Sequence, residues 1–552
     1  MKKITGRSAF LSILRSEGVT HLFGNPGTTE LPIMHALKDY PEIKYILGLQ
    51  ESIVVAMADG YSRATGNLSA CNVHVAPGLG NAMGAIYNAN FVGSPVIITA
   101  GQQEQGHGLM EPMLYGPLVQ MAEPLVKWAT EVTRLEDLPR ILRRAAKIAM
   151  SPPTGPVFIS LPGDILNAEA KLDLGKTTRI KYNIKPDDET LINIKKKMLQ
   201  AKKPIIISGH EVAQTNAFDE ITKFSEIIGA PVYQQTVPHG SHYPSEHKTY
   251  KGTLPRDQVK VKSILEDYDL LICIGSDVLR MSVWNATEPL PKNMSIIHIS
   301  IRDWEIGKNF YTEEAILGNV KTTLSALNKI IEMDIKKSYI QRSNNRLKKI
   351  EENNWSKNKE LLTLQTLKDK NKKPISPNWL MMSITDHISK NNIVIEEALV
   401  SSRNLLKFLP FKNNKDFYGL ASGGIGWAIS GSIGVSLANP TKTIIAIIGD
   451  GSSMYAIQSI WTAAHYNLPI IYVIANNEGY RIIKERLESF HKNTTFIGMD
   501  FNKPKIDFVK IANAMGVEST KVSNPQDLKG LFKKIFKYKK PYLIEVLLEK
   551  GY

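Results

Sequence analysis

The sequence predicts an α/β protein built from three doubly wound parallel sheets, on the strength of three observations. Short apolar runs rich in valine and isoleucine alternate with helix-length segments. This alternation is typical of buried parallel strands that are joined by helices. The 552 residues exceed what one hydrophobic core usually supports, so about three domains are expected. Polar stretches divide the alternation into three series.

The first series predicts an N-terminal domain over residues 1–170. Ser52–Thr65 has the pattern of a helix between two strands. The expected strands are Val19–Phe23, Ile43–Leu49, Leu68–Val75, Pro95–Ala100 and Pro156–Leu161. Strands and helices that alternate in this way form a doubly wound sheet.

The second series predicts a central domain over residues 186–335, after the polar stretch Ala168–Glu189. Its expected strands are Pro204–Ser208, Pro231–Gln234, Asp269–Ile274 and Ser295–Ile301. Residues 336–374 are dense in Lys, Asn, Glu and Gln and have few apolar anchors. They are expected to form an exposed helical or loop connector.

The third series predicts a C-terminal domain over residues 375–552. Its expected strands are Asn392–Glu396, Thr443–Ile448, Pro469–Ala475 and Pro541–Leu548.

The composition is that of a soluble globular protein, with 43% hydrophobic and 22% charged residues. No uncharged apolar stretch approaches the roughly 20 residues that a membrane span needs, so no membrane partner is expected. The first residues are basic, but no apolar block follows them, which argues against a cleaved signal peptide. The expected location is the cytoplasm.

The net charge of +15 raises the question of nucleic acid, but the lysines are spread through the chain. A solvated basic surface that steers anionic substrates is the favoured interpretation, and no nucleic-acid partner is expected. Cys71 and Cys273, the only cysteines, each sit in an apolar run. Both are expected to be inert core thiols.

Asp450 marks the most informative position in the chain. It follows the apolar run Thr443–Ile448 through Gly449, and a second run, Pro469–Ala475, leads into Asn476 and Asn477. Parallel neighbouring strands bring both polar tips to one sheet edge, where α/β proteins bind ligands. A carboxylate and an amide oxygen are hard ligands suited to Mg²⁺, which suggests a metal-held diphosphate.

The residues around Asp450 support this prediction. Gly449 and Gly451 permit close backbone approach, and Ser452 is placed to bond a phosphate oxygen at a helix start. The backbone carbonyl of Gly479, two residues after Asn477, supplies a third protein ligand. The alternative is two ordinary strand-end turns, since glycine and aspartate are common in turns.

The full pattern resembles the thiamin-diphosphate-binding motif of thiamin-dependent decarboxylases and carboligases. Five further stretches resemble benzoylformate decarboxylase and its relatives, in the same order along nearly the whole chain. They are Phe23–Pro32, Leu49–Glu51, His74–Gly84, Gly101–Gln103 and Ser422–Gly426. The resemblance implies thiamin diphosphate and Mg²⁺ as cofactors.

The resemblance also assigns catalytic residues. Glu51 matches the glutamate that bonds a ring nitrogen of the cofactor and activates it; a glutamate at a helix start is otherwise an ordinary dipole partner. His74 matches an active-site acid/base, although a lone histidine there is more often structural. Thr28 takes the position of a serine that bonds the substrate carboxylate, with helix capping by Thr28 or Thr29 as the alternative.

Further residues are expected to bind the cofactor. Ile425 aligns with the large apolar residue that wedges the cofactor into its bent shape, and Gly423 beside it leaves backbone groups free. A plain glycine-rich loop is the alternative. Ser401 follows a strand and is placed to contact diphosphate, but the family pattern is poorly kept at Leu399 and Val400.

Two departures from the family bear on the substrate. Where benzoylformate decarboxylase has a second histidine in the middle domain, alignment places Ser282, which cannot take an imidazole's role. Protonation must then use His74, water or a residue such as His107. The segment Glu478–Arg486 is polar where the family has a more apolar pocket, so an aromatic substrate is not implied.

The resemblance implies non-oxidative decarboxylation of a small-molecule 2-oxo acid to an aldehyde, with the cofactor as electron sink. A carboligase of acetolactate-synthase type, which forms a 2-hydroxy ketone, is the alternative. A catalytically silent cofactor-binding protein is a third. The resemblance further implies a homo-oligomer, at least a dimer and commonly a tetramer, in which Glu51 acts on cofactor held by another subunit. No dinucleotide fingerprint is visible, so no flavin is expected.

Overall fold

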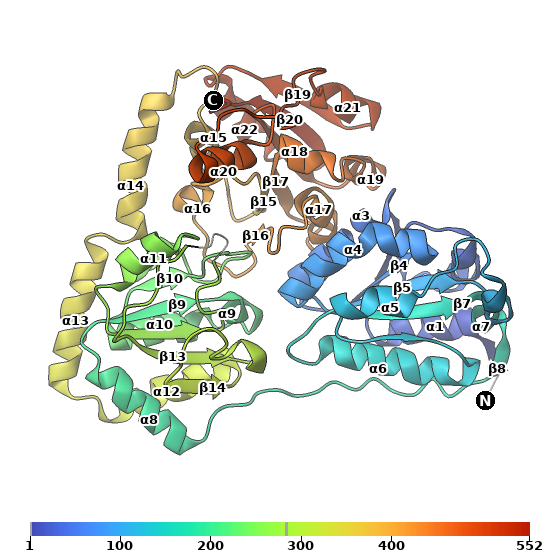
Figure 1. The fold of residues 1–552 in the computed structure, drawn as a ribbon, viewed down its shortest axis with the longest axis horizontal. Helices are drawn as coiled ribbons and strands as arrows, with labels where there is room; N and C mark the ends of the chain where they lie inside the picture. Colours follow the sequence, from blue (N-terminus) through green and yellow to red (C-terminus); the bar gives the residue numbers. More distant parts are fainter. Residues whose placement is uncertain (1–2, 282–284, 552) are drawn as a thin grey trace. The chain divides into compact units, whose positions relative to one another are not determined.

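The computed structural model describes residues 3–281 and 285–551. The chain forms two compact units (Figure 1). The first takes in the chain up to residue 180 together with residues 389–401 and 420 onward, and the second takes in residues 181–388 and 402–419. Two parallel sheets belong to the first unit and one to the second, which confirms the predicted fold class.

The N-terminal sheet of the first unit has the strand order β3-β2-β4-β5-β7-β6, all parallel. Its strands are β2 (His21–Gly24), β3 (Lys44–Leu47), β4 (Ser69–Val73), β5 (Val96–Gln102), β6 (Ala129–Glu131) and β7 (Val157–Pro162). A separate antiparallel ribbon joins β1 (Lys3–Thr5) to β8 (Glu169–Lys171).

The helices around this sheet are α1 (Gly6–Ser16), α2 (Leu31–Ala36), α3 (Glu51–Thr65), α4 (Val75–Val92), α5 (Leu118–Ala122), α6 (Leu138–Met150) and α7 (Gly163–Asn167). Short 3-10 helices cover Thr28–Glu30, Leu37–Asp39, Gln105–Met110, Glu123–Leu125 and Leu135–Asp137. Alternate strand residues face opposite sides, and Leu22 and Ile97 join Phe10 of α1 and Leu142 of α6 in one core. In Figure 1, α6 and α4 lie on opposite sides of this sheet.

The C-terminal sheet of the first unit has the order β15-β17-β18-β20-β19, again parallel. Its strands are β15 (Asn392–Glu397), β17 (Thr443–Gly449), β18 (Ile470–Asn476), β19 (Glu518–Val522) and β20 (Tyr542–Leu547). Its helices are α17 (Trp427–Ala438), α18 (Asp450–Met454), α19 (Ser459–His465), α20 (Arg481–His491), α21 (Phe508–Ala514) and α22 (Asp527–Ile535).

Helices α3 and α17 join the two sheets of the first unit at very close range. A Cβ at Gly434 would lie 1.9 Å from the Met57 carbonyl oxygen, so only glycine fits this crossing. Beside it, the Trp427 Nε1 donates to Asp59 Oδ2 at 2.6 Å. Burial raises the pKa of Asp59, which is fully enclosed. Small residues and one buried polar pair therefore fix how these two helices meet.

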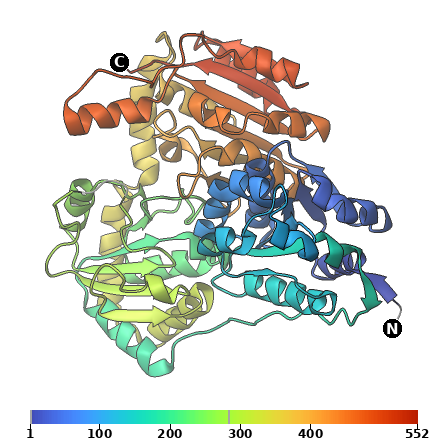
Figure 2. The same cartoon turned by 45° about the vertical axis from the view of Figure 1, so that its right-hand side comes forward.

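The sheet of the second unit has the order β11-β10-β9-β12-β13-β14, and its green strands run side by side in Figure 2. The strands are β9 (Pro204–Ser208), β10 (Val232–Gln234), β11 (Tyr250–Thr253), β12 (Leu270–Ile274), β13 (Ser295–Ser300) and β14 (Glu314–Leu317). A further short strand, β16, covers Phe417–Gly419.

The helices of the second unit are α8 (Asp188–Gln200), α9 (His210–Gln214), α10 (Phe218–Ile228), α11 (Gln258–Leu265), α12 (Val320–Asp334), α13 (Lys337–Glu351), α14 (Trp355–Thr366), α15 (Pro377–Thr385) and α16 (Leu405–Phe408). The 3-10 helices Asp303–Glu305 and Leu367–Asp369 complete the set. Helices α13 and α14 fill most of the predicted connector. The domain boundaries drawn from the sequence stay a prediction.

Two expectations from the composition concern the burial of the two cysteines and the length of apolar helices. Cys71 and Cys273 are both buried free thiols, and burial raises the pKa of each. Among the described residues, no helix is both long enough and apolar enough to span a bilayer.

Candidate active site

The ends of β17 and β18 bring the predicted metal residues together. The two strands are parallel neighbours with Gly449 opposite Ala475, so Asp450 and Asn477 emerge at the same sheet edge. Asp450 is 3% exposed. Its Oδ1 accepts from the Gly451 backbone N–H at 2.9 Å and its Oδ2 from that of Gly479 at 3.0 Å. The sheet thus places the carboxylate against the loop that carries Asn477.

Asn477 supplies the observation that tests whether a cation fits here. Its Nδ2 donates to Ser401 Oγ at 3.2 Å, which turns Oδ1 the other way. Among the described residues, this buried Oδ1 has no hydrogen-bond donor. A buried acceptor without a donor is costly, and a cation bound by the nearby carboxylate would satisfy it. Asp450, Asn477 and Ser401 therefore fit a metal-held diphosphate.

Burial raises the pKa of Asp450 to about 6, and the backbone amides of Gly451, Gly479, Glu478 and Asn477 oppose this shift. The carboxylate is therefore ionised at neutral pH, as a metal ligand must be. Within the described residues, no group of three or more His, Cys, Asp or Glu side chains is arranged to hold a metal. A single carboxylate with neutral oxygens is the kind of donor set that Mg²⁺ completes with substrate or cofactor phosphates and water.

Gly479 is constrained by a close backbone approach. A Cβ there would lie 2.5 Å from the Met499 carbonyl oxygen. Its own carbonyl accepts from the Arg481 N–H at 3.0 Å, which leaves a second lone pair for a ligand. Ser452, 6% exposed, lies in the first turn of α18. The predicted third ligand and phosphate contact thus belong to the same loop cluster as Asp450.

The glycine-rich stretch before α17 packs on α4. Asn88 Nδ2 donates to the Gly424 carbonyl at 2.5 Å, and Ser422 Oγ bonds the same asparagine. Gly423 has φ of +94°, a conformation that favours glycine, and Ile425 beside it is half-buried. These contacts fix the stretch but are separate from those of Asp450.

Glu397 is a buried carboxylate that the sequence analysis missed. It accepts from the backbone N–H groups of Gly426 and Ala428, each at 2.6 Å. Burial raises its pKa to about 8. Its position two residues before Leu399 gave no local signal, because its partners lie about thirty residues later at the start of α17. Glu397 holds the glycine-rich stretch in place.

Glu51 opens α3 directly after β3. It is 6% exposed, and its carboxylate oxygens accept from Asn25 Nδ2 at 3.1 Å and from Asn81 Nδ2 at 3.0 Å. Both asparagines lie in the stretches that carry the family resemblance, but no role was predicted for them. A Cβ at Gly78 would lie within 3.3 Å of the side chains of both Glu51 and His74, so these two residues are neighbours.

His74 is held by a second carboxylate that the sequence analysis passed over. Its Nδ1 lies 2.8 Å from Glu30 Oε2 and 3.2 Å from Thr29 Oγ1. Glu30, 1% exposed, also accepts from Thr29 Oγ1 and from the backbone N–H groups of Gly27 and Gly101. The His74 ring packs over Gly27, where a Cβ would lie 2.1 Å away. The contacts of Nδ1 with Glu30 and Thr29 thus hold the imidazole in one orientation.

Thr28 itself is exposed and lines a cavity of about 640 Å³. His107, the other candidate for protonation, lies on the wall of the same cavity, as do Thr29 and Gln102. The neighbouring Thr29 contacts His74, and the role predicted for Thr28 stays a prediction. The N-terminal candidates thus form one neighbourhood and the Asp450 candidates another, each held by contacts of its own.

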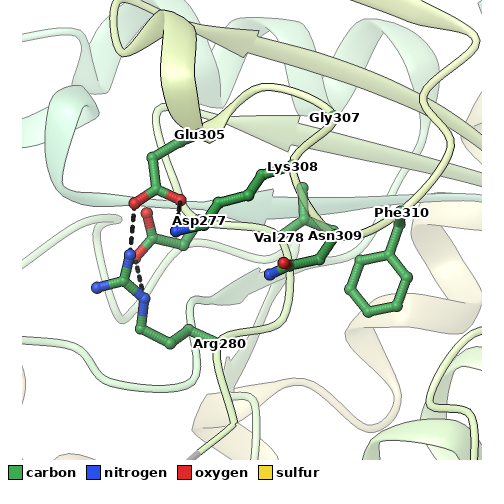
Figure 3. A pocket seen from close by; sticks show the side chains of 8 residues that line it. All are labelled: Asp277, Val278, Arg280, Glu305, Gly307, Lys308, Asn309 and Phe310. Carbon is green, nitrogen blue, oxygen red and sulfur yellow. Dashed lines mark hydrogen bonds and ion pairs between the residues drawn. The ribbon is translucent and has the colours of Figure 1, made fainter.

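The central sheet carries a small cavity where the loops after β12 and β13 meet (Figure 3). Arg280 bonds Asp277 at 3.0 Å and Glu305 at 2.5 Å, and Lys308 lies 3.7 Å from Glu305. The volume of about 20 Å³ has room for one water molecule. Ser282, the predicted replacement for the family's second histidine, lies outside the described residues.

The fold is that of a multidomain α/β protein, and comparisons with known families identify the class to which it belongs. Residues 4–114 match the thiamine pyrophosphate enzyme N-terminal TPP binding domain, residues 191–327 the central domain and residues 401–546 the C-terminal TPP binding domain. The chain belongs to the thiamine pyrophosphate enzymes.

Individual relatives match nearly the whole chain. It is 29% identical to benzoylformate decarboxylase of Pseudomonas aeruginosa over 98% of both chains. It is 26% identical to the acetolactate synthase large subunit of Haemophilus influenzae, over 98% of this chain and 93% of the relative. The solved structure of a Rhodococcus jostii thiamine diphosphate-dependent 4-hydroxybenzoylformate decarboxylase superposes with a TM-score of 0.87, at 28% identity over 99% of each chain.

Proposed function

We propose that the protein is a thiamin-diphosphate-dependent, non-oxidative decarboxylase of a 2-oxo acid that releases an aldehyde. The observation that carries the proposal is the buried Asn477 amide oxygen left without a donor beside Asp450. Relatives named benzoylformate decarboxylase and 4-hydroxybenzoylformate decarboxylase match almost end to end, which favours decarboxylation.

In this proposal, Asp450, Asn477 and the Gly479 carbonyl would hold Mg²⁺, which would in turn bind the diphosphate of the cofactor. Ser401 and Ser452 would bond diphosphate oxygens, Gly449 and Gly451 would let the diphosphate approach the backbone, and Gly423 and Ile425 would contact the rings of the cofactor. The bound cofactor supplies the electron sink for cleavage of the bond between carbonyl and carboxylate. Asp450 alone would repel a diphosphate, so a cation held by Asp450 would be needed to neutralise it.

Glu51 is the residue proposed to bond a ring nitrogen of the cofactor and so activate it. Two asparagine amides restrict its carboxylate to one orientation. His74 is the proposed acid/base at the substrate, with Nδ1 fixed by Glu30 and Nε2 directed to the reacting group. Thr28, on the adjacent cavity, is the proposed partner of the substrate carboxylate.

A homo-oligomer is part of the proposal. The hydrogen-bond partners of Glu51 are Asn25 and Asn81, whereas those of Asp450 are the Gly451 and Gly479 amides. The family resemblance implies that the cofactor contacts both carboxylates. We infer that a second copy of the chain brings its Glu51 to the Asp450 site, so the active form is at least a dimer.

The test is a panel of 2-oxo acids, including pyruvate and benzoylformate, given to purified protein with thiamin diphosphate and Mg²⁺. Carbon dioxide release is followed together with the carbon product. The expected result is cofactor-dependent release of carbon dioxide with an aldehyde from at least one acid.

The relatives named acetolactate synthase keep one alternative open, because they match over a similar share of the chain. A 2-hydroxy ketone as the main product would make the protein a carboligase. Bound cofactor without turnover of any acid would contradict both activities and favour a catalytically silent protein.

A further inference from the structure

Glu478 occupies a backbone conformation that glutamate rarely adopts. It follows Asn477 directly and has φ of +60°, in the left-handed region. Outside glycine, this region is populated mainly by asparagine and aspartate, and other side chains pay a conformational cost. The contacts of the Glu478 side chain must therefore offset this conformational cost, or the residue must have a role that justifies it.

The Glu478 carboxylate joins two segments that are distant in sequence. Its Oε1 lies 2.8 Å from Lys505 Nζ, and its Oε2 lies 2.6 Å from Lys550 Nζ. The Glu478 side chain is 14% exposed, whereas the lysines are 68% and 48% exposed. Lys505 belongs to the loop before α21, and Lys550 belongs to the C-terminal tail, residues 549–551. The carboxylate is thus the enclosed centre of a two-lysine clamp.

The C-terminal tail also contacts Arg481, the first residue of α20. Arg481 Nη1 donates to the Glu549 carbonyl at 3.2 Å. The backbone of Gly551 rests on the Arg481 guanidinium, since a Cβ there would lie 2.7 Å from Cζ. Upstream, the Leu548 N–H donates to the Asn476 carbonyl at 2.8 Å. Residues 548–551 therefore run along the segment 476–481, which contains Asn477 and Gly479.

We propose that Glu478 is a positioning residue that ties the C-terminal tail and Lys505 to the loop 477–479. It thereby holds the Asn477 amide oxygen and the Gly479 carbonyl ready for the cation. This inference rests on the proposed function of the loop as a Mg²⁺ site. Two backbone hydrogen bonds extend the restraint. The Phe501 N–H donates to the Glu478 carbonyl at 3.0 Å, and the N–H of Tyr480, the residue after the loop, donates to the Met499 carbonyl at 2.9 Å.

A loop that is already ordered loses less conformational freedom when the metal binds. Without the clamp, ordering must occur on binding and appears as weaker affinity for Mg²⁺. At saturating Mg²⁺ the loop reaches the same bound geometry. The clamp therefore affects the dissociation constant for Mg²⁺ more than the turnover number.

The experiment measures Mg²⁺ binding by isothermal titration calorimetry at saturating thiamin diphosphate. Glu478→Gln and Lys550→Ala are compared with the wild-type protein and with Lys533→Ala, an exposed lysine on α22. The two clamp variants are expected to bind Mg²⁺ about tenfold more weakly, equivalent to about 1.4 kcal/mol. Their kcat at saturating Mg²⁺ is expected to change less than their affinity, and Lys533→Ala is expected to change neither.

Glu478→Gly separates the clamp from the backbone strain. Glycine relieves the cost of φ at +60° but removes both ion pairs, so it is expected to bind Mg²⁺ more weakly despite an easier backbone. Affinity equal to or tighter than that of the wild-type protein would overturn the proposal. In the double variant Glu478→Gln with Lys550→Ala, the loss of Mg²⁺ affinity should not exceed that of Glu478→Gln alone, because Lys550 acts through Glu478. Additive losses of Mg²⁺ affinity would contradict the proposal.

The design distinguishes this inference from the function on which it rests. Failure of the wild-type protein to bind Mg²⁺ and thiamin diphosphate would refute the proposed site. Normal wild-type binding with unchanged affinity in the clamp variants would refute the clamp alone. Melting temperatures measured without Mg²⁺ show whether each variant is folded, and Lys550→Ala, a surface change, remains informative if Glu478→Gly does not fold.

Discussion

Glu51 presents each carboxylate oxygen to one asparagine amide, an arrangement that fixes its direction. Glu51→Gln keeps the size of the side chain but replaces one carboxylate oxygen by an amide NH₂ group. That group would face the NH₂ donor of an asparagine. We predict retained cofactor binding and a turnover number about 10²- to 10⁴-fold lower, the usual contribution of an acid/base group.

The check is kcat measured beside the dissociation constant for thiamin diphosphate. Glu136→Gln, an exposed exchange in the same unit, serves as the control and should change neither. Turnover equal to that of the wild-type protein in Glu51→Gln would remove Glu51 from the mechanism.

His210 in the second unit predicts how stability depends on pH. It is 5% exposed, and its ring centroid lies 5.3 Å from that of His239 and 6.5 Å from that of His242. Burial lowers the pKa of His210 well below 6.5, and the charges of Arg302 and the two neighbouring histidines act in the same direction.

Since the folded-state pKa lies below the unfolded value, the unfolded chain binds more protons below pH 6.5. The stabilisation is complete above the unfolded pKa and is lost as pH falls below it, by about 1.4 kcal/mol per pH unit for one such group. We predict a melting temperature that falls between pH 6.5 and pH 5, with a smaller fall in His210→Gln. His491→Gln, at an exposed site, should keep the wild-type slope, and an equal slope in all three proteins would contradict the prediction.

Among the elements, the crossing of α3 and α17 is the tightest contact within the first unit. Gly434→Ala would drive a methyl group into the Met57 carbonyl, 1.9 Å away. We predict destabilisation by about 1–3 kcal/mol, the usual cost of overpacking.

The matched control is Gly530→Ala on α22, where a Cβ meets no atom within 4 Å. That change should stabilise the protein by about 0.5–1 kcal/mol, because alanine is the better helix former. Chemical denaturation of both variants checks the pair. Equal effects at the two positions would show that the close approach is not required.

The central strands were predictable because strands buried on both faces are continuous apolar runs. Val157–Pro162 is such a run, and its predicted bounds differ by one residue. The edge strand Ala129–Glu131 was missed because it is short, polar and half-buried throughout. The edge strand Glu518–Val522 was missed because it is mostly polar, with Glu518 and Lys521 exposed and only Val522 buried.

The candidate site residues divide in the same way, into those that a local sequence pattern reveals and those that it does not. Asp450 and Asn477 directly follow buried apolar strands, so the pattern of strands in the sequence is enough to place them at one sheet edge. Glu30 and Glu397 depend on partners far along the chain, such as Gly101 and Gly426, and no local pattern reports those contacts. The residues proposed to meet the ligand were therefore easier to find than the residues that hold them in place.

At the scale of the whole molecule, the proposed sharing of a site between two copies makes a complementation prediction. Glu51→Gln should be inactive, and Asp450→Ala should lose metal-dependent cofactor binding. In a dimer containing one of each, one site carries both changes and the other carries neither. Random reassembly of equal amounts should restore about a quarter of wild-type activity, since half the dimers are mixed and each has one intact site.

The activity of the mixture is measured after dissociation and reassembly, with each variant treated alone as the control. A mixture no more active than its components would place both residues on the same subunit's cofactor, or would remove one of them from the site.

The most direct measurement is the ratio of aldehyde to carbon dioxide formed from the best 2-oxo acid of the panel, with thiamin diphosphate and Mg²⁺ bound. A decarboxylase gives one aldehyde for each carbon dioxide, and this ratio of about one is the predicted result. Carbon dioxide accompanied by a 2-hydroxy ketone in place of aldehyde would contradict it, as would the absence of carbon dioxide from protein that holds its cofactor.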